Sequence, residues 1–176
     1  MKTFNLQENK ILHIGPNKSE YDYVVKMINP TTYDRVALSK NEIVNLPKDI
    51  TKNSLKQEYY DLVIIWHVLE HIKDDVKAIK NLFSSLRYGG KMLVSVPIHP
   101  KGNPKTIEDD KIDEKEYENI YGDRHHVRSC GLDYVERFIK AGFQLIQDVK
   151  VKNINPNKIE YFGLSTNHIA WICEKS

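Results

Sequence analysis

The sequence has few of the features that mark exported or membrane proteins. It contains two cysteines in 176 residues, Cys130 and Cys173, which lie far apart and form no C-x-x-C pair. That spacing argues against a disulfide framework and against a thiolate zinc site. No apolar run reaches the roughly 18 residues that a membrane span requires, and residues 1–10 lack the apolar core of a signal peptide. We therefore expect a cytoplasmic protein with no membrane partner.

Charge of one sign is not concentrated in any segment. The 26 basic residues are balanced by 24 acidic ones, and no block of lysine and arginine is present that would neutralise a row of phosphates. Nucleic acid is therefore not an expected partner. Apolar residues (40%) and charged residues (28%) occur at proportions usual for a globular protein, without repeats or low-complexity segments. The length suits a single domain over residues 1–176.

Short apolar runs alternate with helical patterns along the chain. The runs at 62–66 and 92–96 are continuously apolar, as in strands covered on both faces of a parallel sheet. Residues 152–167 are too short and too rich in Asn and Gly for a crossover helix, which predicts an antiparallel hairpin at the sheet edge. The other predicted strands are 11–14, 35–38, 144–151 and 169–173.

Two segments have the period of an amphipathic helix. Residues 74–86 carry an apolar face opposite lysines and are closed by Gly89-Gly90. Residues 132–141 end before Gly142 and place Tyr134, Phe138 and Ala141 against the sheet. The alternation predicts a Rossmann-like, doubly wound α/β sheet, mostly parallel with a C-terminal antiparallel hairpin. The apolar face of the first helix is Val76, Ile79, Leu82, Phe83 and Leu86.

Residues 98–130 differ in composition from the rest of the chain. They combine mixed charge with Pro, Gly and Asn, and they show little apolar periodicity. The segment follows the carboxyl end of the predicted strand at 92–96, where ligands bind in open α/β sheets. We therefore expect it to form a lid or insertion over the site.

Three ionisable residues, His67, Glu70 and His71, follow directly after the predicted strand at 62–66. The string matches the H-x-x-E-H pattern of inverted zinc peptidases, in which two histidines one helical turn apart bind the metal. That pattern requires a helix, whereas here the preceding strand places His67 in a turn. No third ligand is evident from the sequence. Zinc-dependent hydrolysis thus remains a distant alternative, and we assign no metal ligand.

A resemblance to a known family connects these residues. The segment YDLVIIWHVLEHI at 60–72, then a helix, then LRYGGKMLVSVP at 86–97, resembles the core of class I S-adenosylmethionine-dependent methyltransferases. The family pattern there is "DLV…HVLEH…A…….LKPGG.L….P". A terminal antiparallel hairpin is also how that fold ends its sheet. The matching positions are Asp61, His67, Glu70, His71, Ala78, Leu86, Gly89, Gly90 and Pro97.

A narrower resemblance covers two further segments. YGDRHHVRSCGLDY at 121–134 and AGF at 141–143 resemble the "G…HVR.YG.DY…L..AGF" signature of a small bacterial methyltransferase subgroup. That subgroup also has "LH.GP" in its first loop, and this chain has Leu12-His-Ile-Gly-Pro16. The resemblance implies a small-molecule or glycan-type acceptor, methylated on oxygen or nitrogen. It implies nothing about the oligomeric state.

The resemblance also implies a set of site residues. S-adenosylmethionine would bind at the carboxyl ends of the predicted strands at 11–14, 35–38 and 92–96. His71 or His126 would act as the base, because an imidazole near the methyl donor can accept a proton from a hydroxyl nucleophile. Arg128 would orient a polar or anionic substrate. The expected cofactor contacts are Gly15, Pro16, Ser39, Asp49, Ile50, Trp66 and His67.

The first two loops depart from the family pattern. The family's first loop has the form GxGxG, whereas here the string is Gly15-Pro-Asn-Lys-Ser19, and no carboxylate stands at Ala37 or Leu38 to bind the ribose hydroxyls. Losing that charged contact costs about 1.5 to 3 kcal/mol of binding free energy. A catalytically weak or inactive methyltransferase-like binding protein is therefore the main alternative. In that case Gly15 is a simple turn, and Glu70 and His71 begin the next helix.

Overall fold

The computed structural model describes residues 9–150, 157 and 169–176, and within these ranges seven strands form one sheet. The strands are β1 (Lys10–Ile14), β2 (Thr32–Ala37), β3 (Leu46–Pro47), β4 (Tyr60–Trp66), β5 (Leu86–Ser95), β6 (Phe143–Lys150) and β7 (Ile169–Lys175). Their order across the sheet is β3-β2-β1-β4-β5-β7-β6.

The direction of the strands confirms the predicted fold class. The strands from β3 to β5 pair in parallel, whereas β7 pairs antiparallel with both β5 and β6. The predicted edge hairpin is therefore present, although the segment that joins its strands lies outside the described residues, as does Val151. A single strand, β7, therefore runs against the other six and separates β6 from β5 at the edge of the sheet.

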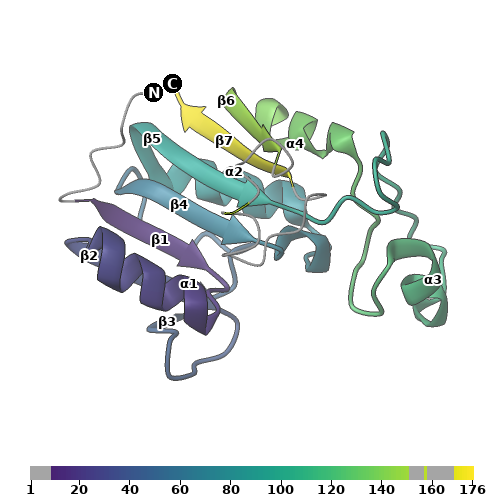
Figure 1. Cartoon of the computed structure of the whole chain (residues 1–176), viewed down its shortest axis with the longest axis horizontal. Helices are drawn as coiled ribbons and strands as arrows, with labels where there is room; N and C mark the ends of the chain where they lie inside the picture. The colour runs from purple at the N-terminus through teal and green to yellow at the C-terminus, as the bar shows by residue number, and fades with distance from the viewer. Residues whose placement is uncertain (1–8, 151–156, 158–168) are drawn as a thin grey trace.

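Helices cover both faces of the sheet (Figure 1). Helix α1 (Lys18–Tyr23) continues through the π-helical turn η1 (Val24–Ile28) and buries Val24 against Ile11 and Ile64. Helices α2 (Asp75–Ser85) and α4 (Val135–Lys140) lie on the other face, over the larger core. Alternate residues of β4 therefore enter different cores, with Val63 and Ile65 in the larger one. Both faces of β4 are buried, as its continuous apolar run predicts.

The structure confirms the packing predicted for the second helix, at residues 132–141. The chain enters it through the 3-10 turn η4 (Leu132–Tyr134) and continues into α4. Tyr134 and Phe138 are fully buried, and the Phe138 ring meets Trp171 of β7 at 5.9 Å between centroids. These contacts attach α4 to the antiparallel end of the sheet.

Two local predictions about α2 and its end were wrong. Val76 is 46% exposed, while Asp75 is 1% exposed, so the buried face is rotated by one residue at the start of the helix. Asp75 is buried because it binds two arginines, a contact that apolar periodicity does not register. Gly89-Gly90 does not close the helix, which already ends at Ser85, but lies in a bulge where β5 shifts register against β4. A Cβ at Gly90 would lie 2.8 Å from the carbonyl oxygen of Arg87.

The segment between β5 and η4 leaves the carboxyl edge of the sheet and returns to it (Figure 1). It contains the 3-10 turn η3 (Glu114–Glu116) and the short helix α3 (Tyr117–Tyr121), which lies at its far end. Two isolated β-bridges, Ile98 with Cys130 and Ile107 with Ser129, join the part of the segment that leaves the sheet to the part that returns. Within the described ranges, no helix is both long enough and apolar enough to cross a bilayer.

Candidate active site

The chain makes a tight turn where β4 ends. His67 has a left-handed backbone with φ of 49°, and its amide donates to the carbonyl of Ser95 at 3.0 Å. Such a conformation is uncommon for a residue with a side chain and is concentrated at functional sites. The next residues form the 3-10 turn η2 (Leu69–His71), and α2 begins only at Asp75. His67 therefore lies in a turn, as predicted, and it shares no helix with His71, so the helical H-x-x-E-H arrangement is absent.

Residues 125–128, far along the chain, bind directly to this turn. The amide of Val127 donates to the carbonyl of Glu70 at 3.0 Å, and Nδ1 of His71 lies 3.0 Å from the carbonyl oxygen of His125. The two segments that the sequence motifs single out thus form one unit.

Arg128 joins the two segments through hydrogen bonds from its side chain. Its guanidinium donates to the carbonyls of Leu69 at 2.8 Å, Ile72 at 2.7 Å and Lys73 at 2.9 Å. Its Nε donates to Glu108 at 2.8 Å, and the side chain is only 2% exposed. These bonds show that Arg128 positions the η2 turn. Its expected role in orienting a substrate stays a prediction.

Asp75 completes the network around Arg128. It accepts two hydrogen bonds of 2.7 Å from Arg137 and one from the Tyr134 hydroxyl, and lies 3.5 Å from Arg128. Burial, together with the Asp75 charge, raises the pKa of Tyr134 well above its usual range. A buried carboxylate with two guanidinium partners is a stable arrangement only while all of them remain. This network holds α2, η4 and the 125–128 segment together.

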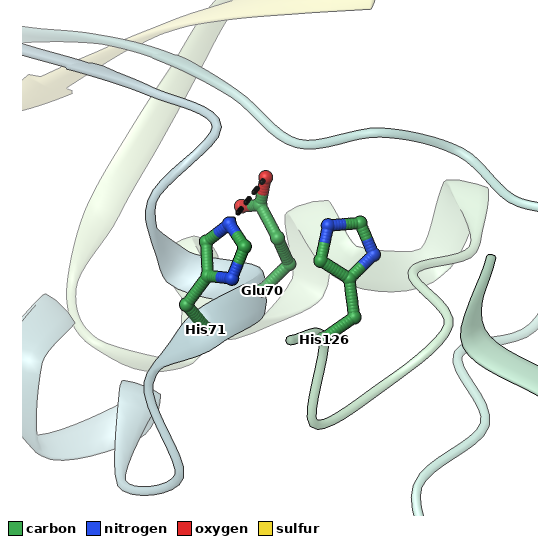
Figure 2. A group of neighbouring side chains, drawn as sticks. All are labelled: Glu70, His71 and His126. Carbon is green, nitrogen blue, oxygen red and sulfur yellow. Dashed lines mark ion pairs between the residues drawn. The ribbon is translucent and has the colours of Figure 1, made fainter. Parts of the chain in front are cut away.

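Glu70, His71 and His126 form a cluster at the surface of this unit (Figure 2). The Glu70 side chain is 1% exposed, and its Oε1 lies 3.9 Å from Nε2 of His71 and 3.6 Å from Nδ1 of His67. The rings of His71 and His126 meet edge to face, with their centroids 4.8 Å apart. The structure thus brings together two of the residues predicted as catalytic and adds Glu70, which the sequence did not single out as a site residue.

The first loop has a different geometry from the one the family pattern implies. Gly15 has a left-handed φ of 63°, and a Cβ there would lie 2.8 Å from Cγ2 of Val68. Its amide donates to Val36 at 2.8 Å, and Pro16 beside it is buried. Gly15 is therefore required for the turn and for the close approach of Val68, the neighbour of His67.

Two groups near this loop were not predicted from the sequence. His13 in β1 is 1% exposed, with Nδ1 2.9 Å from the Tyr33 hydroxyl and Nε2 3.4 Å from the Glu20 carboxylate. Burial raises the pKa of Glu20, but His13, the Asn17 amide and the charge of His67 outweigh it, so the pKa is lowered. The spacing of Asn17 and Glu20 is a capping box, which the sequence alone could have revealed.

The residues after β2 provide the remaining expected contacts. Ser39 is exposed, while Ile50 is 4% exposed and packs in the core. Asp49 accepts hydrogen bonds from the amide of Thr51 at 2.9 Å and from its hydroxyl at 2.7 Å, which lower the pKa of Asp49.

A small polar cavity is lined by residues that neighbour the cluster in sequence. Its volume is about 210 Å³, and Val127 and Arg128, which follow His126, form one wall. Lys73, Tyr117 and the acidic residues 108–110 form the rest of the lining.

Fold and sequence comparisons agree on the class of protein. The sheet order and the helices on both faces are those of a class I S-adenosylmethionine-dependent methyltransferase. The model of a methyltransferase-domain family matches residues 10–148. The chain belongs to this family, and S-adenosylmethionine is its cofactor. No protein of curated function matches the sequence.

Solved structures share the fold at low identity. An S-adenosylmethionine-dependent methyltransferase from Mesorhizobium loti is 14% identical with a TM-score of 0.67, covering 96% of this chain and 92% of the other. Phosphoethanolamine N-methyltransferase 2 from Haemonchus contortus, in complex with S-adenosyl-L-methionine, is 16% identical with a TM-score of 0.64, covering 96% and 49%. A [4+2]-cyclase is 12% identical with a TM-score of 0.68, covering 96% and 76%.

Proposed function

We propose that the protein methylates an oxygen or nitrogen atom of a small-molecule or glycan-type acceptor that lies against the Glu70, His71 and His126 cluster. The observation that carries this proposal is the pair of imidazoles beside the carboxyl end of β4. In this family the carboxyl edge of the sheet is where S-adenosylmethionine binds, so both histidines lie at the edge that faces the methyl donor.

The hydrogen bonds of the two rings support their role as proton acceptors. Nδ1 of His71 lies 3.0 Å from the carbonyl oxygen of His125, and Nδ1 of His126 lies 3.2 Å from that of Tyr121. Because a carbonyl oxygen only accepts, the proton of each neutral ring resides on Nδ1. Each Nε2 then carries a lone pair. A hydroxyl acceptor that binds there has a base for the proton it must release.

Methyl transfer requires few other groups from the protein. The sulfonium is already activated, and the methyl group moves by in-line displacement as the carbon–sulfur bond breaks and the new bond to the acceptor forms. The protein supplies alignment and exclusion of water. Arg128 contributes by fixing the turn that carries Glu70 and His71.

The expected cofactor contacts belong to the same proposal. Most of these contacts lie at the carboxyl ends of three neighbouring strands: Gly15 and Pro16 follow β1, Ser39 follows β2, and Trp66 is the last residue of β4, with His67 next to it. Asp49 and Ile50, farther along the chain, would lie beside the adenine. Ser39 is the nearest hydroxyl to replace the missing ribose carboxylate.

The lid and the acceptor class are linked in this proposal. Residues 98–130 carry His126 and form most of the wall of the 210 Å³ cavity. A cavity of that size suits a small molecule or a single sugar better than a polymer. The mixed charge of its lining, with Lys73 against residues 108–110, suits a polar acceptor.

One alternative has its own support. The single glycine of the first loop and the absence of a carboxylate at residues 37–39 favour a methyltransferase-like binding protein that does not turn over.

Calorimetry with S-adenosylmethionine and S-adenosylhomocysteine tests the proposal first. We expect both to bind one to one, with a dissociation constant weakened by about one to two decades relative to a relative that has the ribose carboxylate. Formation of S-adenosylhomocysteine with a panel of hydroxylated and aminated small molecules and sugars then tests transfer. Binding without any transfer supports the alternative, and no heat at millimolar ligand contradicts both.

A further inference from the structure

We propose that Glu70, His71 and His126 bind a divalent transition-metal ion, with Zn²⁺ as the expected best fit. One donor atom from each residue lies within 4.8 Å of the others. Two imidazoles and one carboxylate are a ligand set suited to zinc and to other first-row divalent ions. This departs from the expectation, from sequence alone, of no metal ligand.

The hydrogen bonds of both histidines are those of metal ligands. A histidine that binds a metal through one ring nitrogen usually donates the other N–H to a carbonyl or carboxylate. Here Nδ1 of His71 and Nδ1 of His126 each lie at hydrogen-bonding distance from a backbone carbonyl. Both Nε2 atoms are therefore left with lone pairs, and Figure 2 shows the Glu70 carboxylate between the two rings.

Glu70 supplies an independent reason for a cation. Its Oε2 is buried and has no hydrogen-bond donor among the described residues. Its Oε1 lies 3.6 Å from Nδ1 of His67 and 3.9 Å from Nε2 of His71, both longer than a hydrogen bond. Buried carboxylate oxygens are normally paired, and one left without a donor is unfavourable. A metal ion between Glu70 and the two rings would satisfy this oxygen.

The positions of the three donors are fixed well enough for binding. The Val127-to-Glu70 hydrogen bond joins the backbones next to His126 and His71, and Arg128 binds three carbonyls of the same turn. Metal–ligand distances of about 2.0 to 2.1 Å place ligand atoms roughly 3 to 3.5 Å apart. The 3.9 Å between Nε2 of His71 and Oε1 of Glu70 therefore has to close by less than about 1 Å, and the widest pair of the cluster, within 4.8 Å, by less than about 2 Å.

The site would be open on one side. The His71 side chain is 41% exposed, so a metal held by three protein ligands keeps at least one position for solvent or acceptor. Resting on the proposed function, the metal would bind the acceptor oxygen and lower its pKa. The acceptor O–H releases its proton to water, its oxygen bonds to the methyl carbon, and the carbon–sulfur bond breaks to leave S-adenosylhomocysteine. With the metal bound, the Nε2 lone pairs of His71 and His126 bind the ion and no longer accept a proton. The metal then promotes deprotonation of the acceptor in their place.

Titration of the chelator-treated, full-length protein with Zn²⁺ tests the site. We expect one ion per chain, with at least a tenfold loss of affinity in Glu70→Gln, His71→Gln and His126→Gln. His125→Gln is the matched control, because it changes a neighbouring exposed imidazole whose backbone carbonyl remains. Circular dichroism of each variant shows whether it is folded, and the visible spectrum of bound Co²⁺ reports nitrogen and oxygen ligation directly.

The outcomes separate the metal site from the methyltransferase function. No stoichiometric binding of Zn²⁺, or binding that the three substitutions leave unchanged while His125→Gln weakens it, overturns the site. Titration of the same samples with S-adenosylmethionine tests the proposed function independently of the metal site. Cofactor binding without zinc binding overturns the metal site alone, and zinc binding without cofactor binding supports the site while contradicting the proposed function.

Discussion

The imidazole rings of His71 and His126 lie edge to face with their centroids 4.8 Å apart, although the residues belong to separate segments of the chain. His71 belongs to η2 after β4, and His126 belongs to the excursion that follows β5. The contact is made because Val127 and Arg128, the next two residues, bind the backbone of the η2 turn. The candidate site therefore depends on how the segment between β5 and η4 packs against the η2 turn.

Replacing His126 should impair methyl transfer and leave cofactor affinity unchanged. We expect His126→Asn to lower kcat by about 10²- to 10⁴-fold, since the acceptor loses the group that assists its deprotonation. S-adenosylmethionine affinity, measured by calorimetry, should stay within twofold. His125→Asn is the control, and an equal loss of activity in both variants would contradict the assignment.

Arg128 should be required for stability. Arg128→Met leaves Asp75 and three carbonyls of the η2 turn with fewer partners, so we expect a loss of about 3 to 5 kcal/mol in the free energy of unfolding. Arg87→Met is the comparison, because Arg87 pairs with Asp61 at an exposed position and should cost at most about 1 kcal/mol. Urea denaturation measures both. Similar losses in the two variants would show that burial does not determine how much each arginine contributes to the free energy of unfolding.

Gly15 should be constrained by its neighbour as well as by its backbone. Gly15 and Gly102 both have positive φ, but only at Gly15 would a Cβ meet another residue, Val68, at 2.8 Å. Gly102→Ala should cost about 1 kcal/mol, and Gly15→Ala at least about 1 kcal/mol more. Adding Val68→Ala should remove part of that difference in a double-mutant cycle. Equal costs at both glycines would exclude the contact with Val68 as a cause.

Stability should fall on acidification through Glu108. Burial raises the pKa of Glu108, but its hydrogen bonds with Arg128 and Arg137 outweigh burial and lower it. A lowered folded pKa adds stability that is present above the unfolded value, about 4.3, and is lost as the pH falls through the folded value. Glu108→Gln should therefore flatten the dependence of unfolding free energy on pH below about 4.3, whereas Glu118→Gln, on the exposed side of α3, should not. An unchanged slope would contradict the network.

Both thiols should be unreactive in the native protein. Burial raises the pKa of Cys130 to about 12, with a further contribution from the Glu70 charge, and burial alone raises the pKa of Cys173 to about 12. At pH 8 almost no thiolate is present. A disulfide reagent should therefore titrate no thiol in the native state and both after denaturation. Rapid native reaction would indicate that the excursion around Cys130 opens.

The sequence on its own determined the class of the sheet and six of its seven described strands. Apolar runs identified β1, β4 and β7 closely, whereas the two-residue strand β3 was not predicted because it is too short to show a pattern. The same patterns gave the helix 74–86 and most of its buried face, but they placed Val76 rather than Asp75 at its start, since Asp75 is buried by ion pairs that a hydrophobic period does not record. The resemblance to class I methyltransferases gave the cofactor, which the family match confirms.

Only the tertiary structure decided which ionisable groups share a site. The sequence identified His71 and His126 separately, but their contact arises from hydrogen bonds between distant backbones, and no local pattern encodes it. The subgroup resemblance implied that Arg128 orients a substrate, yet its guanidinium binds three backbone carbonyls that the fold alone brings together. Glu70 became a candidate ligand for a similar reason. Its Oε2 is buried without a hydrogen-bond donor in the part of the chain that the structure describes, and Val127, distant in sequence, binds the backbone carbonyl of the same residue.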